Sequence, residues 1–250
     1  MIYWIWLTQL PFIGHVTARY LIEELKDAEN IYKADAGHLA EIPGLSEQQR
    51  RSILQNHSLE LPKRIFEDCQ NNNISILCWN DKRYPVRAKK PADAPVVLYY
   101  KGNFKNMDQT VGIVGVRRCS QESKQKTVAL ASEYAQKQVT VVSGMAKGID
   151  SYAHTACLNA GGYTVAILGN GLDICYPSEH NKLMKCIEEK GLLISEYQPG
   201  IQPDKYRFPR RNRLIGSWSD KLFVIEAGRG SGALITAEYS RKYGREVEMM

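Results

Sequence analysis

Residues 141–177 read VVSGMAKGIDSYAHTACLNAGGYTVAILGNGLDICYP, and their pattern gives the clearest indication of the fold class. It opens with a short β-branched run that ends at Ser143-Gly144. A segment from about Ile149 to Ala160 has the composition of a helix, and the apolar run YTVAILG follows it. Two apolar strands separated by one helix form a βαβ unit, in which the strands are parallel.

The same alternation continues on both sides of this stretch. The strand-like run VGIVGV precedes it, and LLISE and KLFVIEAG follow; further helices are expected at about 122–138, 181–189, 212–217 and 234–243. The pattern predicts an α/β domain, with a mostly parallel sheet and helices on both faces. Such sheets bind ligands beyond the carboxyl ends of their strands, so a site is expected in the loops that follow the strands.

Residues 1–70 are predicted to form a small, all-helical domain. Two segments, LPFIGHVTARYLIEEL and IPGLSEQQRRSIL, each place a Pro…Gly turn before an amphipathic helix. Ser46, with Gln49 three residues later, fits a capping box. This is the pattern of a helix-hairpin-helix pair. Its turns either present backbone N–H groups to a phosphate or only pack the two hairpins together, and the sequence leaves both interpretations open.

The second domain is predicted to span residues 71–250. The strand-like runs ISILCW and VVLYY flank a proline-containing segment, and we expect them to add strands to the edge of the following sheet. Residues 245–250 alternate like a strand but are too few to cover a sheet edge completely.

The composition is that of a globular protein with a mild positive charge. Apolar residues make up 44% of the chain and the net charge is +6, which favours an anionic partner where the charges cluster. Six cysteines without a C-x-x-C pair indicate reduced thiols in a cytoplasmic protein and give no reason to expect a metal. Pro11 and Gly14 interrupt the apolar amino terminus, which we therefore interpret as a helix, and no stretch is long enough to span a membrane.

Glycine and basic residues gather in the loops that follow the strands. The clusters are residues 115–118, 143–148, 169–171 and 228–232, and their cations are Arg117, Arg118, Lys147 and Arg229. Glycine lets the backbone approach a phosphate closely, and a helix amino terminus attracts negative charge. No loop matches the G-x-G-x-x-G fingerprint or the P-loop, so we expect no NAD, no ATP hydrolysis and no cofactor.

The densest basic run is KYRFPRRNR, residues 205–213. Arginines such as Arg211 suit phosphates and stack on bases, and Tyr206 and Phe208 offer stacking faces. We expect Glu196 and Glu226 to pair with some of these arginines and to leave the others for an anionic ligand.

Ser143, Asp150 and His154 are the residue types of a catalytic triad, but their spacing does not favour one. Asp150 and His154 lie four residues apart on a predicted helix, where an i,i+4 pair is the simpler expectation. Nothing supplies a G-x-S-x-G nucleophile elbow. We therefore predict no catalytic residues.

Four segments together resemble the DNA-processing A (DprA/Smf) family in order and spacing: GIVGVRRCS, residues 141–177, LLISEYQPG and residues 208–246. The combination of SG-x-A-[KR]-GID-x-x-AH, G-x-G-x-D-x-x-YP and FP-x-RNR carries the resemblance. It implies a Rossmann-like fold behind a helical SAM-like domain. It also implies a protein that binds and protects single-stranded DNA during natural transformation, helps to load the recombinase RecA, and commonly forms a homodimer.

The resemblance also implies a set of DNA-binding residues. Carried over by motif, they are Gly115, Arg117, Arg118, Ser143, Gly144, Lys147, Gly148, Asn212 and Arg213, with Gly232 lining the pocket; Phe208 and Arg211 join them from the basic run. We expect Arg117→Glu, Lys147→Glu or Arg213→Glu to abolish binding and to leave the fold intact. Val116 departs from the small Ser or Ala that is usual in the family, and we expect no winged-helix domain within these residues.

Two other functions are weighed against DNA binding. Nucleotide N-glycosidases of related fold resemble one another in a P-G-G-x-G-T-x-x-E motif, whereas this chain has EAGRGSG at 226–232 and lacks Pro-Gly-Gly. A sensor domain for a free nucleotide is the third possibility. Release of free base from nucleoside monophosphates would identify the enzyme, and calorimetry with nucleotides would identify the sensor.

Overall fold

The computed structural model describes residues 1–228 and 230–250. The chain divides into two units, which are described separately: Met1–Tyr84 with Ala92–Leu98, and Pro85–Pro91 with Tyr99–Met250. Arg229, one of the cations noted in the sequence, lies outside the described residues.

The first unit is helical, as predicted. Its elements are α1 (Ile2–Gln9), α2 (His15–Leu25), α3 (Ala28–Lys33), α4 (Ala36–Glu41), α5 (Glu47–Gln55), α6 (Glu60–Asn71) and the strand β1 (Ser75–Cys78). Its core contains Trp6, Leu21, Leu39 and Ile53, all buried. The last of these helices therefore ends at Asn71, and the unit continues beyond it to Tyr84.

Each Pro…Gly turn of this unit accepts hydrogen bonds from the helix of the other hairpin. Ser46 and Gln49 form the predicted capping box at the start of α5. The Gln49 amide donates to Phe12 O at 3.3 Å, and Ser52 Oγ donates to Pro11 O at 2.6 Å. Tyr20 donates from α2 to Pro43 O at 3.0 Å, so the two hairpins pack on each other through their turns.

The second unit is built on the predicted sheet. The strands are β2 (Val97–Gly102), β3 (Thr110–Gly115), β4 (Thr140–Ser143), β5 (Thr164–Leu168), β6 (Leu192–Ser195), β7 (Lys221–Ile225) and β8 (Glu246–Met249). The strand order is β1-β2-β6-β5-β4-β3-β7-β8. Strands β3 to β8 pair in parallel, whereas β2 adds to the edge of β6 in the antiparallel direction. This confirms a mostly parallel sheet with a preceding strand at its edge.

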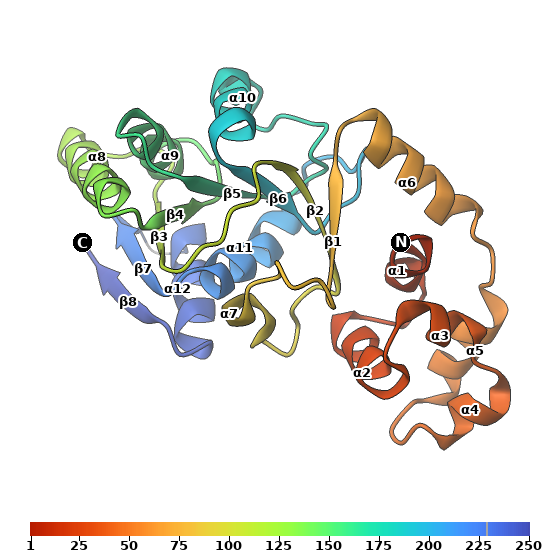
Figure 1. Ribbon diagram of the computed structural model, residues 1–250. Helices are drawn as coiled ribbons and strands as arrows, with labels where there is room; N and C mark the ends of the chain where they lie inside the picture. Colours follow the sequence, from red (N-terminus) through yellow and green to blue (C-terminus); the bar gives the residue numbers. More distant parts are fainter. Residues whose placement is uncertain (229) are drawn as a thin grey trace. The chain divides into compact units, whose positions relative to one another are not determined.

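Helices cover both faces of this sheet, as predicted (Figure 1). They are α7 (Val86–Lys89), α8 (Gln121–Gln136), α9 (Ile149–Asn159), α10 (Asn181–Lys190), α11 (Arg207–Trp218) and α12 (Gly232–Lys242), with a short 3-10 turn at Ser178–His180. Helices α8, α9 and α10 lie on one face, and α7, α11 and α12 lie on the other. None of the helices in the two described stretches is long and apolar enough to cross a membrane.

Helix α11 begins at Arg207, earlier than the predicted start near Asn212. Pro209 is its third residue, and a proline in the first helical turn breaks no hydrogen bond, because those N–H groups have no partner within the helix. The early start brings most of the basic run into helix α11.

The strand order creates a switch point at β3. From β3 the chain proceeds to β4, β5 and β6 on one side, and it then returns to β7 on the other side of β3. The loops that follow β3 and β7 therefore leave the sheet in opposite directions. A crevice between such loops is where open α/β sheets bind their ligands.

Candidate functional site

A groove lies in the second unit where the sequence predicts a site. Its main cavity has a volume of about 620 Å³ and is lined by the end of β3 with the following loop, by the first turns of α11, and by the start of α12. A smaller cavity of about 40 Å³ adjoins it. The residues that line both cavities are Arg117, Ala146, Tyr176, Phe208 and Arg211. The two cavities are called the groove below.

Most of the predicted site residues line this groove. They are Gly115, Arg117, Gly144, Lys147, Phe208, Arg211, Asn212 and Gly232. Four others do not line it: Arg118, Ser143, Gly148 and Arg213. The alternating pattern of the sequence thus brings together loops that are more than a hundred residues apart in the chain.

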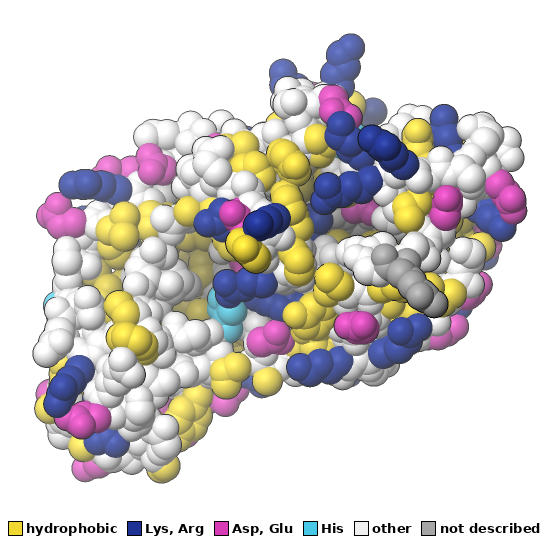
Figure 2. All heavy atoms as spheres, turned by 180° about the vertical axis from the view of Figure 1, so that it is seen from behind, with side chains coloured by type: hydrophobic (Ala, Val, Ile, Leu, Met, Phe, Trp, Pro, Cys, Tyr) yellow, Lys and Arg dark blue, Asp and Glu magenta, His cyan; other side chains and the backbone are white. Residues whose placement is uncertain are grey.

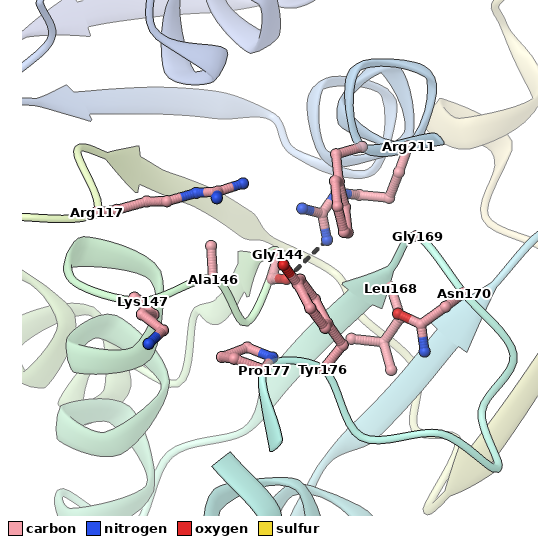
Figure 3. Close-up of a pocket in the computed structure, with 11 residues that line it drawn as sticks. Arg117, Gly144, Ala146, Lys147, Leu168, Gly169, Asn170, Tyr176, Pro177 and Arg211 are labelled. Carbon is pink, nitrogen blue, oxygen red and sulfur yellow. Dashed lines mark hydrogen bonds between the residues drawn. The ribbon is translucent and has the colours of Figure 1, made fainter. Parts of the chain in front are cut away.

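Two guanidinium groups point into the groove from opposite sides. Figure 3 shows Arg117 entering from the loop after β3 and Arg211 from α11. Burial lowers the pKa of Arg211 to about 10, and the nearby charge of Arg117 also lowers it. Cations that face one another in this way favour an anion between or beside them.

Lys147 brings a third cation to the groove. Its Nζ lies 2.7 Å from Glu179 Oε2, and about half of each side chain is exposed. An exposed ion pair of this kind contributes little free energy, so Glu179 is a weak competitor for a phosphate at Lys147.

A stacked aromatic pair stands beside these cations. The rings of Tyr176 and Phe208 are 5.3 Å apart and inclined by 21°, and the Arg117 guanidinium lies 5.9 Å from the centre of the Phe208 ring. Tyr176 is 40% exposed, so its ring is accessible to a ligand. Our sequence analysis did not name Tyr176 as a site residue, although it is the tyrosine of the D-x-x-YP motif.

Gly148 sets the path of the loop that carries Lys147. It has a φ of 78° and stands at the amino terminus of α9. A Cβ at this position would lie 2.4 Å from Val116 O and 2.6 Å from Arg117 O, so only glycine fits against the neighbouring loop. Gly148 therefore determines how close the Arg117 and Lys147 loops can come.

Several predicted site residues are buried and bonded within the protein. Ser143 is fully buried and donates to Ile113 O at 2.6 Å. Asn212 donates to Gly232 O at 2.9 Å and joins α11 to α12. These contacts give Ser143 and Asn212 a structural role, and their contact with a ligand stays a prediction.

Arg213 forms a buried ion pair with Glu196. The two side chains are 5% and 3% exposed, and Arg213 Nη2 contacts Glu196 Oε2. This confirms the expected pairing with Glu196. Arg213→Glu would place a second carboxylate opposite Glu196 away from water, so we expect this substitution, unlike Arg117→Glu and Lys147→Glu, to destabilise the fold.

The other acidic residue expected to pair with an arginine does something different. The Glu226 carboxylate accepts the Ser120 N–H at 2.8 Å, and this hydrogen bond is the main cause of its lowered pKa. Glu226 thus stabilises the start of α8, and it does not line the groove.

The predicted pair between Asp150 and His154 is also wrong. Thr164 Oγ1 donates to Val141 O, so the His154 Nδ1–H donates to Thr164 Oγ1, at 2.7 Å. Burial lowers the pKa of His154 to about 3, which keeps the ring neutral. Asp150 instead accepts hydrogen bonds from the N–H groups of Gly144 and Ala146. Asp150 and His154 therefore serve the fold separately.

Basic side chains also gather on one face of the second unit. In the upper right of Figure 2, several Lys and Arg side chains lie near one another around exposed apolar side chains. A positive surface with apolar surface beside it is suited to a polyanion that also carries flat, apolar groups.

Comparison with known proteins identifies relatives over most of the chain. Residues 75–250 match the model of the family described as "DNA recombination-mediator protein A". The chain is 34% identical to Protein Smf of Synechocystis over 98% of this chain and 63% of that protein. It is 42% identical to the DNA processing protein DprA of Streptococcus pneumoniae over 70% of this chain and 61% of that protein. The chain thus spans about three fifths of the length of these relatives.

Two solved structures are similar in both fold and sequence. The crystal structure of DprA from S. pneumoniae superimposes with a TM-score of 0.83 at 31% identity, over 99% of this chain and 84% of that one. A structure of DNA processing protein A from Helicobacter pylori has a TM-score of 0.65 at 32% identity, over 70% of this chain and 80% of that one. The work on the H. pylori protein describes its "unique single-stranded DNA binding mode".

Proposed function

The chain belongs to the DNA recombination-mediator protein A family, and from this premise we propose that its groove binds single-stranded DNA without performing chemistry on it. The observation that carries the proposal is the convergence of cations and aromatic rings on one groove. Arg117 and Lys147 supply exposed positive charge, and the stacked pair of Tyr176 and Phe208 supplies flat apolar surface.

This combination favours a single strand over a duplex. Exposed cations interact with the phosphates of either form, and they release counterions from both. Aromatic rings, by contrast, stack only on bases that are not already paired and stacked, and each such contact is worth about 1–3 kcal/mol. The H. pylori relative, whose work concerns a single-stranded DNA binding mode, supports the same assignment.

The carboxylates of the groove support binding rather than hydrolysis. Among the described residues, Asp150 and Asp204 line the main cavity. Asp150 accepts two backbone N–H groups, and Asp204 accepts the Tyr206 N–H at 2.8 Å. Each of these carboxylates thus has an oxygen that accepts backbone N–H groups, and this gives both a role in holding the fold. Incubation with nucleoside monophosphates should therefore release no free base.

The wider role rests on the family. We propose that the protein protects incoming single strands during natural transformation in the cytoplasm, helps to load a RecA-type recombinase, and works as a homodimer. Light scattering at micromolar concentration tests the last of these. A mass of twice 28.3 kDa is expected, and the mass of a single chain at all concentrations would exclude the homodimer.

Fluorescence anisotropy with matched oligonucleotides tests the binding itself. We expect tighter binding to a labelled oligo-dT than to a duplex of equal length, with an affinity that falls steeply as salt rises. Lys105→Glu is the matched control for Lys147→Glu. Lys105 is exposed and carries the same charge, but it precedes β3 and so lies near the amino-terminal ends of the parallel strands, away from the groove. Equal affinity for both DNA forms, or equal effects of the two variants, would contradict the proposal.

A further inference from the structure

The loop between β4 and α9 has a conformation that needs external support. It carries Lys147 to the groove, and two of its residues lie in the left-handed region: Met145 with a φ of 57° and Gly148 with a φ of 78°. A residue with a side chain pays a steric cost in that region, so Met145 stays there only where the surroundings hold it. The question is which groups hold this loop.

Asp150 holds the loop by accepting hydrogen bonds from backbone N–H groups of the loop. This residue lies in the first turn of α9 and is 5% exposed. Its Oδ2 accepts the Gly144 N–H at 3.1 Å and the Ala146 N–H at 3.4 Å. One carboxylate oxygen therefore satisfies the backbone on both sides of Met145.

Arg211 holds the same loop by donating a hydrogen bond to one of the loop's backbone carbonyl groups. It reaches from α11, is 5% exposed, and donates to Gly144 O at 2.7 Å and also to Ile167 O. Figure 3 shows the bond between Arg211 and Gly144 at the edge of the smaller cavity. The backbone of Gly144 is thus held at its N–H by a carboxylate and at its C=O by a guanidinium.

The two charges also act on each other. Burial raises the pKa of Asp150, and the charge of Arg211 opposes that rise. Burial lowers the pKa of Arg211, and the charge of Asp150 opposes that fall. Each residue therefore helps its partner to remain ionised in a site where an isolated charge would be costly.

We propose that Asp150 is a positioning residue for DNA binding, which together with Arg211 holds the backbone of Gly144 and so fixes Lys147 at the groove. This inference rests on the proposed function. It gives Asp150 a role that its position beside His154 in the sequence did not suggest. In this role Asp150 acts through the loop, because its buried carboxylate accepts hydrogen bonds from the N–H groups of Gly144 and Ala146.

Two substitutions separate the hydrogen bonds from the charge. Asp150→Ala removes both, whereas Asp150→Asn keeps an oxygen that can accept the N–H groups and removes the charge that faces Arg211. We expect the affinity for single-stranded DNA to fall by about tenfold in the alanine variant and by less in the asparagine variant, since two buried N–H groups lose their partner only in the first.

Hydrogen exchange at single amides shows whether the loop is the cause. In Asp150→Ala, exchange should become faster at Gly144 and Ala146, while the strand amides of Val142 and Val165 remain protected. Cys157→Ala is the control, because it opens a small cavity at the far end of α9 in the hydrophobic core. It should lower stability without changing DNA affinity or the exchange of the loop.

The possible results distinguish this inference from the function on which it rests. Failure of the unchanged protein to bind single-stranded DNA would refute the proposed function. Binding by the unchanged protein, together with undiminished affinity in folded Asp150→Ala, would overturn the positioning role of Asp150. Where the alanine variant does not fold, undiminished affinity in folded Asp150→Asn would overturn it equally.

Discussion

Substitution of either Arg213 or Glu196 should lower the free energy of unfolding, mainly because it breaks the buried ion pair between them. Arg213 projects from α11, and Glu196 follows β6 directly. Their side chains are 5% and 3% exposed, so neither charge can be solvated if its partner is removed. We expect Arg213→Met to act first on folding, although the residue belongs to a motif that the family resemblance assigns to DNA.

The expected magnitude follows from the burial. Removing one partner of a buried pair costs about 3–5 kcal/mol, because it leaves an uncompensated charge away from water. A domain is typically stable by about 5–15 kcal/mol, so this loss is a large fraction of the total. Removing both partners, in Arg213→Met with Glu196→Gln, should cost less than the sum of the single changes.

Urea unfolding followed by tryptophan fluorescence measures these differences, because Trp218 is buried on the same helix as Arg213. The exposed pair of Lys126 and Glu122 is the control, and breaking it should cost less than about 1 kcal/mol. A loss below about 1 kcal/mol for Arg213→Met, or strictly additive effects in the double variant, would refute the structural role of the pair.

Three further results are expected. Arg117→Glu and Lys147→Glu should each keep the fold and weaken binding to single-stranded DNA. Each should also reduce the slope of log affinity against log salt concentration by about one, as fluorescence anisotropy across a salt series would show. An unchanged slope would mean that these two residues do not contact the phosphates. Gly148→Ala should lower the free energy of unfolding by about 1–2 kcal/mol or more, because an alanine is strained at a positive φ and its Cβ would lie 2.4 Å from Val116 O. The same strain should weaken DNA binding. Wild-type affinity in this variant would show that the loop tolerates the shift. His154 takes up a proton in the unfolded chain near pH 6.5, but in the folded protein only near its pKa of about 3. The free energy of unfolding should therefore fall as the pH drops through this range, by about 2 kcal/mol between pH 7 and pH 5, and it should fall less in His154→Gln. Equal pH dependence of stability in the two proteins would show that His154 is not the cause.

The sheet was predictable because its strands β3 to β7 are buried on both faces. Runs such as VTVVSG and YTVAILG are continuously apolar, and the glycines after them mark where each strand ends. The same regularity located the groove, since the carboxyl ends of parallel strands share one edge. The boundary of α11 was harder to place, because Pro209 and the neighbouring charges obscure the start of the helix.

The roles of individual side chains were less predictable, because they depend on partners that are distant in the sequence. From the sequence, Arg213 is expected to be an exposed cation, whereas the structure pairs it with Glu196, which follows β6. Asp150 looks like a partner of His154 until the turn after β4 brings the Gly144 N–H closer. Tyr176 lies in a long loop, and only the position of Phe208 on α11 shows that the two rings stack.

Photocrosslinking tests most directly whether single-stranded DNA lies in the groove. Oligonucleotides that carry iodouracil react under light with aromatic rings against which the base is stacked, and mass spectrometry identifies the crosslinked residue. We expect crosslinks at Tyr176 or Phe208, which disappear in competition with unlabelled single strands and persist with duplex. Crosslinks confined to the first unit, or their survival in Arg117→Glu with Lys147→Glu, would contradict the assignment of the groove as the DNA-binding site.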